Sequence, residues 1–166
     1  MSHQLPYRGV LTDALVDYLT EAQPLADATI LVGDGLVHPD AGWNGTPGQK
    51  HYVRSLTLFT AAATPVPAPE SLRGRHTSWL CDYTVLLTAG ERTHADNGAD
   101  IARNTLAGFR AKVGELEMGD YVWKLADCYF AALAPVVADH RTEPPTWLVR
   151  DTFTVRLERN RSEQRP

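Results

Sequence analysis

An amphipathic pattern near the start of the chain predicts a helix over residues 11–23. Apolar side chains recur there at the three- and four-residue spacings of one helix face; they are Leu15, Tyr18, Leu19 and Ala22. Acidic residues occupy the opposite side, and Pro24 follows directly. The hydroxyl of Thr12 is suited to an N-cap, and Asp13 places a negative charge where a helix N-terminus favours one.

A second helical pattern follows Gly90 and predicts a helix over residues 93–113. Small and apolar side chains recur in it at steps of four and three residues; they are Ala95, Ala99, Ala102, Leu106, Phe109 and Val113. The small residues would let the first half lie close to a sheet, Asp96 is expected to cap the helix, and Gly114 is suited to end it. Polar side chains are predicted on the remaining arc: Asp100, Arg103, Asn104, Arg110 and Lys112.

Alternating apolar and polar residues predict the strands of the first half. A short β-branched run over residues 28–32 is followed by Gly33-Asp34-Gly35, which reads as a turn. Residues 51–60 suit a strand that is partly covered on both faces, residues 79–87 alternate, and prolines and a glycine separate the two segments. They are therefore predicted to pair as a hairpin with a long loop.

The second half of the chain carries the clearest strand. Residues 121–129 predict one strand, whereas residues 130–138 fit either a strand or a buried turn of helix. After Pro144-Pro145, a strand of about 11 residues is expected, with alternate side chains on opposite faces. One face is apolar, with Trp147, Val149, Phe153, Val155 and Leu157; the other is polar, with Arg150, Thr152, Thr154, Arg156 and Glu158. Asp151 falls on the apolar face, so either a bulge shifts the register or its carboxylate meets a buried donor.

This order of elements predicts an α+β fold. It is helix, strands, helix and strands again, which favours an antiparallel or mixed β-sheet with two α-helices packed on one face. The 166 residues suit one domain, because domains usually hold about 100–200 residues. We expect a single domain over residues 1–160 and a flexible polar tail over residues 161–166.

Residues 36–50 form a long segment rich in glycine and proline. Long loops without structure of their own are uncommon in compact domains and often make contacts, so this segment is a candidate contact region. Trp43 near its middle is the expected anchor. Equally, Trp43 could fold back and cover one end of the core.

Composition narrows the classes of function. The formal net charge is −4 and the hydrophobic fraction is 43%, values typical of a soluble globular protein without a global positive field for nucleic acid or anionic membranes. Two cysteines are too few for a secreted disulfide scaffold, and we expect both to be reduced and buried. The sequence shows neither a secretory signal nor an apolar stretch long enough to span a membrane, which favours the cytoplasm.

Motifs for catalysis are missing from the sequence. The six histidines never stand three or four residues apart, as helical metal ligands would. The nucleophile elbow and the glycine-rich phosphate loops are also missing. We therefore expect no catalytic, cofactor-binding or metal-binding residues, no cofactor, and a protein that is not an enzyme.

Several segments carry a resemblance to a known family. The likeness spans residues 5–158. In the first half it comprises the opening helix, Gly33-Asp34-Gly35 after a strand, and the strands from Tyr52 and from Tyr83. In the second half it comprises the helix Ala95-Asp96 through Ala102-Arg103-x-x-Leu106-x-Gly108, then Ala134-Pro135-Val136-Val137-x-Asp139, and then Trp147-x-Val149-Arg150-Asp151-Thr152-Phe153. In these segments the chain resembles the tail terminator proteins of long-tailed bacteriophages. The helix looks like the family's alanine-rich, arginine-bearing helix with a Leu-x-Gly finish, and the closing stretch, which looks like the family's final strand with its Asp-x-Phe, is the most distinctive part.

The resemblance implies a structural virion protein. Such a subunit would form a homo-oligomeric ring, a hexamer, that caps the tail tube and stops its polymerisation. Its partners would be other copies of itself, the tail tube protein and a head-completion or connector protein. DNA would pass through the central channel without specific binding, and no membrane would be involved. The protein would lie at the head–tail interface of the virion after assembly in the host cytoplasm.

Candidate contacts to these partners are one aromatic residue and four arginines: Trp43, Arg103, Arg110, Arg150 and Arg156. Two other functions stay open at this point. One is another phage neck or tail-tube subunit of similar build. The other is a small ligand-binding or enzymatic α+β domain that would use Trp43, His51 and Asp151.

Overall fold

The computed structural model describes residues 7–22, 30–34, 54–66, 78–118, 121–141 and 145–159. The helices are a π-helical turn (Tyr7–Leu11), α1 (Thr12–Ala22), α2 (Arg92–Leu106) and α3 (Phe109–Val113). The strands are β1 (Ile30–Asp34), β2 (Arg54–Pro65), β3 (Ser78–Ala89), β4 (Glu115–Met118), β5 (Tyr121–Ala132), β6 (Val137–Asp139) and β7 (Thr146–Arg159).

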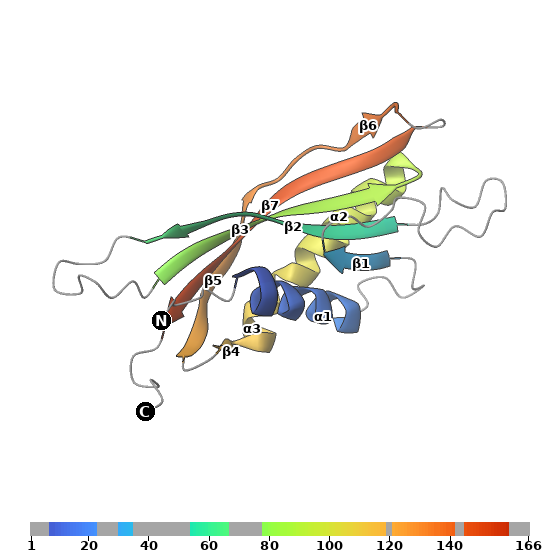
Figure 1. Cartoon of the computed structure of the whole chain (residues 1–166). Helices are drawn as coiled ribbons and strands as arrows, with labels where there is room; N and C mark the ends of the chain where they lie inside the picture. Colours follow the sequence, from blue (N-terminus) through green and yellow to red (C-terminus); the bar gives the residue numbers. More distant parts are fainter. Residues whose placement is uncertain are drawn as a thin grey trace.

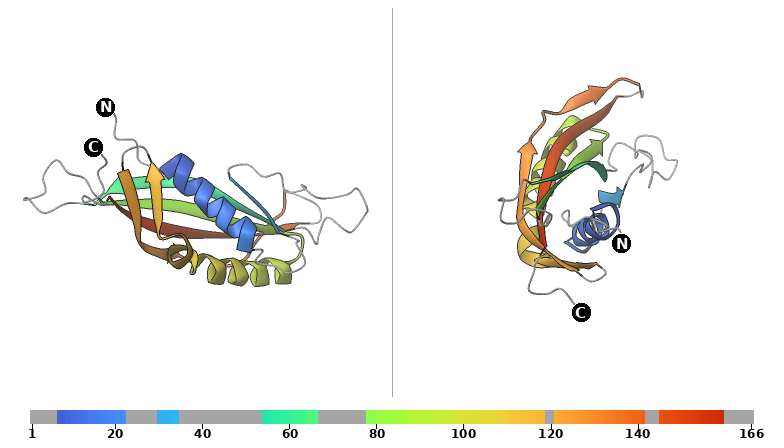
Figure 2. Two further views of the ribbon diagram at one scale, coloured as in Figure 1. Left: turned by 90° about the horizontal axis from the view of Figure 1, so that it is seen from below. Right: turned by 60° about the vertical axis from the view of Figure 1, so that its left-hand side comes forward.

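These strands form one curled sheet (Figures 1 and 2). The strand order is β1-β2-β3-β7-β5-β4, and β6 pairs with β7 beside the end of β5. Only β1 and β2 run parallel; the other pairs are antiparallel. Both main helices pack on the concave face, so the predicted α+β architecture with a mixed sheet is confirmed.

The core lies between that face and the helices. β3 and β7 form its floor, and their inward side chains meet in register, as Tyr83 does with Phe153 and Leu87 with Val149. The predicted apolar faces of the two helices cover them with buried side chains: Leu15 and Leu19 of α1, and Ala95, Ala99, Ala102 and Leu106 of α2. The hairpin of β2 and β3 is also as predicted.

The start of α1 corrects one prediction. Thr12 is not an N-cap, because the chain enters α1 through a π-helical turn that begins at Tyr7. The fully buried Thr12 hydroxyl donates to the carbonyl oxygen of Tyr7 at 2.9 Å and lies 2.8 Å from Tyr83 Oη. The preceding turn supplies the backbone partners that a cap would have supplied.

The second helix is divided, where one continuous helix was predicted. The amide N–H of Gly108 bonds to the carbonyl of Thr105, which tightens the turn and ends α2 before α3 begins. Asp96 is an internal residue of α2, and Glu91 holds the N-cap position, so the capping prediction for Asp96 was wrong. Gly114 ends α3 as predicted, with a φ of +71° that favours glycine.

Strand limits also differ from the sequence pattern. Gly33 and Asp34 belong to β1 rather than to a turn. The ambiguous segment 130–138 completes β5, crosses an irregular stretch and enters β6; it contains no helical turn. The short strand β4 was not predicted, and β6 begins within the segment that the pattern left open, because three or four residues are too few for a pattern to emerge.

Some predictions concern residues outside the described ranges. They include the 36–50 segment with Trp43, the polar tail 161–166 and His51. Within the described ranges, none of the helices has the length and apolar character needed to cross a membrane.

Candidate functional site

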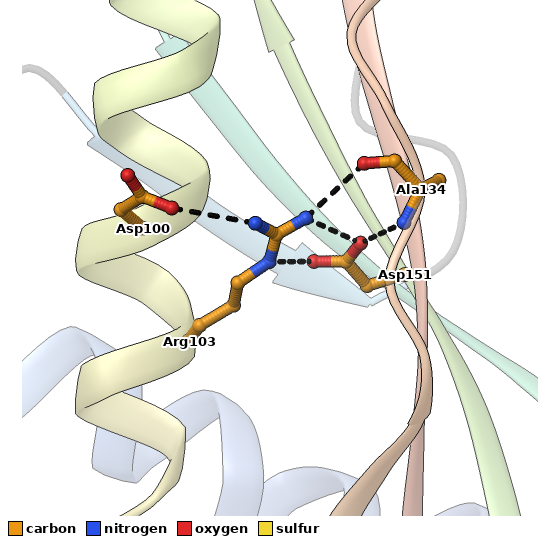
Figure 3. A network of polar contacts seen from close by, with 4 residues as sticks. All are labelled: Asp100, Arg103, Ala134 and Asp151. Carbon is orange, nitrogen blue, oxygen red and sulfur yellow. Dashed lines mark hydrogen bonds and ion pairs between the residues drawn. The ribbon is translucent and has the colours of Figure 1, made fainter.

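The most organised polar site of the described residues is centred on Asp151 of β7 (Figure 3). Arg103 of α2 reaches it with two hydrogen bonds, from Nε to Oδ2 at 2.7 Å and from Nη2 to Oδ1 at 2.8 Å. The Asp151 side chain is only 4% exposed, and that of Arg103 is 21% exposed. Such a two-bond pair is directional as well as strong, because the planar guanidinium matches the carboxylate.

A third segment joins this pair. Ala134, in the irregular stretch between β5 and β6, donates its amide N–H to Asp151 Oδ1 at 2.9 Å. Its carbonyl oxygen accepts a bond from Arg103 Nη2 at 3.2 Å. We call Arg103, Asp151 and the backbone of Ala134 the clamp. It fastens a helix, a central strand and an edge segment at one point.

The clamp explains the position of Asp151 in the sequence pattern. The sequence pattern had left two explanations for Asp151, a bulge in β7 or a buried donor. No bulge is present, since β7 pairs with β3 without a shift in register at Val85 and Asp151, and Arg103 is the buried donor. The helical pattern had put Arg103 on the solvent arc, and that placement was wrong. A long side chain at the margin of an apolar helix face can turn toward a buried carboxylate, and only the fold brings the two together.

Charge within the clamp is balanced. The pKa of Arg103 is raised above its ordinary value, mainly by the hydrogen bond to Asp151. Asp100, 70% exposed, adds a weaker contact of 3.3 Å to Arg103 Nη1. Both oxygens of Asp151 are occupied by donors, so this carboxylate is arranged to hold structure rather than to take a proton from a substrate.

The other candidate arginines lie apart from the clamp. Arg150 and Arg156 project from the convex face of β7, and Arg110 is exposed on α3. Arg156 makes an exposed ion pair of 3.3 Å with Glu158. The structure therefore does not gather the four arginines into one patch.

A second polar cluster, which the sequence reasoning missed, surrounds Tyr7. Its hydroxyl donates to the backbone carbonyl of Asp82 and accepts from the amide of Ala61 at 2.9 Å, where β2 bulges. Burial raises the pKa of Tyr7 to about 12. Tyr83 Oη donates to the carbonyl of Tyr7 at 3.0 Å, so this cluster ties the π-helical turn to the sheet.

A reactive thiol or a cluster of metal ligands would also make a functional site. Cys81 and Cys128 are free thiols; Cys81 is buried as expected, whereas Cys128 is only half-buried. Burial raises the pKa of each to about 12, so neither is activated as a thiolate. The described residues contain no group of three or more His, Cys, Asp or Glu side chains that could hold a metal ion.

A scan against models of protein families gives no match for the chain, and a search of the curated proteins finds none either.

Proposed function

We propose that this chain is a tail terminator subunit of a long-tailed bacteriophage. In this role it forms a ring, a hexamer, that caps the tail tube, stops its polymerisation and receives the head-completion protein. DNA passes through the ring without specific binding, and the net charge of −4 suits a channel that does not hold DNA back.

One observation carries the proposal. Three of the segments on which the resemblance rests meet in the clamp: the alanine-rich helix through Arg103, the Asp-x-Phe strand through Asp151, and the Ala134-Pro135 segment through Ala134. They are separated by up to 48 positions in the chain. The segments that resemble the tail terminator family are therefore in contact in the folded subunit. Such contact supports a common subunit fold better than matches scattered over the molecule would.

The decisive experiment is deletion of the gene from the phage that carries it. We expect tail tubes of uncontrolled length and few tails joined to heads, with normal tails restored by a plasmid copy. Tails of normal length after the deletion would reject the terminator role.

The same deletion separates the alternative virion roles. Loss of a tube subunit would leave no tubes at all. Loss of another neck protein would leave tails of normal length that fail to join heads. Light scattering on the purified protein tests the ring itself, and a monomer at all concentrations would argue against it.

A further inference from the structure

A proline interrupts the sheet between β5 and β6. β5 ends at Ala132, β6 begins at Val137, and Pro135 lies in the irregular stretch between them. Proline has no backbone N–H to give to a sheet ladder, so it favours a break in the pairing with β7. We call residues 133–139, which run from this break to the end of β6, the strap.

The strap buries little of its own surface. Leu133 and Val137 are 59% and 56% exposed, and none of the residues of the strap is buried. Val136 is half-buried and packs against the hydrophobic core. The neighbouring β7 differs, because it carries fully packed side chains such as Val149 and Phe153. Burial of apolar surface is the main force that holds an element in a fold, so the strap is held less firmly than β7.

Polar contacts fasten the strap at both ends. Near its start, the amide and the carbonyl of Ala134 bond to Asp151 and Arg103 at 2.9 and 3.2 Å (Figure 3). At its end, the three residues of β6 pair with β7 (Figure 1). When the strap moves away, water can replace such hydrogen bonds at a small net cost.

The ion pair of the clamp does not depend on the strap. Arg103 gives Asp151 two hydrogen bonds of 2.7 and 2.8 Å, and Ala134 adds one more. Breaking a buried ion pair is costly mainly because it leaves a buried charge without a partner. Release of Ala134 leaves the pair intact, so the strap can detach without that cost. Arg103 and Asp151 thus form a fixed binding site for the backbone of Ala134.

We propose that the strap opens as a unit while the rest of the subunit stays folded, and that the clamp holds it closed. Opening exposes the side of β7 from Thr146 to Leu148, which β6 covers in the closed state. The closed strap therefore covers a strand edge that would otherwise be open to pairing with another chain. This device belongs to the single subunit, so it is independent of the proposed ring.

Hydrogen exchange of the full-length wild-type protein tests the opening. Exchange is measured at several urea concentrations below the unfolding transition, with light scattering to show that the state of assembly is constant. Local opening exposes little surface, so we expect the amides of the strap to be protected but to exchange at rates that depend little on urea. The amides of β3 and the centre of β7 should exchange with the steep urea dependence of global unfolding.

Two results of this measurement would overturn the proposal. If the strap shared the rates and the urea dependence of β3 and β7, it would open only when the whole subunit unfolds. If the amides of the strap exchanged as fast as in an unfolded chain, the clamp would not hold it closed.

A matched pair of valine variants tests whether the strap opens as a unit. Val136→Ala weakens the contact with the core and should raise the exchange rates throughout the strap by about fivefold. Val137→Ala makes the same change at the exposed neighbour and should raise them less than about twofold. Equal rates in the two variants would show that Val136 stays packed during exchange, which overturns opening as a unit.

A conservative variant tests the clamp. Arg103→Lys keeps a positive charge beside Asp151, but it lacks the planar fork that binds this carboxylate and the Ala134 carbonyl together. We expect exchange in the strap to rise at least about tenfold and to stay insensitive to urea, with circular dichroism showing a folded subunit. Asp100→Ala removes only an exposed contact to the same arginine and should change exchange less than about twofold. Wild-type exchange of the strap in Arg103→Lys would overturn the role of the clamp.

Discussion

Arg103 and Asp151 are joined by two hydrogen bonds of 2.7 and 2.8 Å, although they stand 48 positions apart in the chain. The carboxylate is nearly buried, and the guanidinium also reaches the carbonyl of Ala134. α2 is therefore fixed to β7 by a directional contact in addition to apolar packing. The same contact holds the irregular stretch between β5 and β6 at Ala134.

Removal of Arg103 should be costly. Arg103→Met leaves the buried Asp151 carboxylate without its counter-charge, so we expect the free energy of unfolding to fall by about 3–5 kcal/mol. Urea denaturation measures this change. Asp100→Ala is the matched control, because it removes only the exposed contact to the same arginine and should cost less than about 1 kcal/mol. Equal costs for the two variants would contradict a structural clamp.

Gly108 is expected to resist substitution because of Tyr18. A Cβ atom at residue 108 would lie 2.8 Å from Tyr18 Oη, which donates a 2.6 Å hydrogen bond to the carbonyl of Thr105. Gly108→Ala should therefore displace the hydroxyl and cost about 1–3 kcal/mol of stability. In a Tyr18→Phe background the hydroxyl is absent, so the additional cost of Gly108→Ala should be smaller. A double-mutant cycle in urea measures the coupling, and additive costs would refute it.

Stability should decline at alkaline pH. Burial raises the pKa of Cys81 and Cys128 from 9.0 to about 12 in the folded protein. As pH rises above 9.0, the unfolded chain therefore loses these protons first, and the free energy of unfolding falls until pH reaches about 12. The contribution is fully present below pH 9.0.

A double variant isolates this effect. Cys81→Ala with Cys128→Ala should show a shallower decline of stability over the same pH range, measured as urea midpoints. Tyr7, whose pKa is raised from 10.0 to about 12, keeps part of the slope in both proteins. An unchanged slope in the double variant would exclude the thiols as its source.

Arg150 and Arg156, two of the candidate contact residues, can be tested by reversing their charges. Arg150→Glu with Arg156→Glu reverses two charges on the convex face of β7, and because each ring contact repeats around the ring, we expect weaker ring formation by a folded subunit. In infected cells the expected phenotype is overlong or headless tails. Arg8→Glu with Lys112→Glu, at exposed positions outside the sheet, is the matched control. Normal tails and full titre from the convex-face variant would remove both arginines from the interface.

Much of the architecture follows from the sequence by itself. Repeats of three and four residues determined the core faces of α1 and α2, and alternation determined the hairpin and the long strand β7. These patterns are local, since each buried face repeats within a single element. The odd position of Asp151 on an apolar face was equally visible, because one charge breaks an otherwise regular alternation.

Only the tertiary structure decided what such positions do. Arg103 and Thr12 looked like a solvent-facing residue and a cap, yet one binds Asp151 and the other lies buried against Tyr83. Tyr18 donates to the same Thr105 carbonyl as the turn at Gly108, although Tyr18 and Thr105 stand 87 positions apart. Each of these roles is set by a partner distant in sequence, and local periodicity carries no information about which distant side chain the fold will bring within hydrogen-bonding distance.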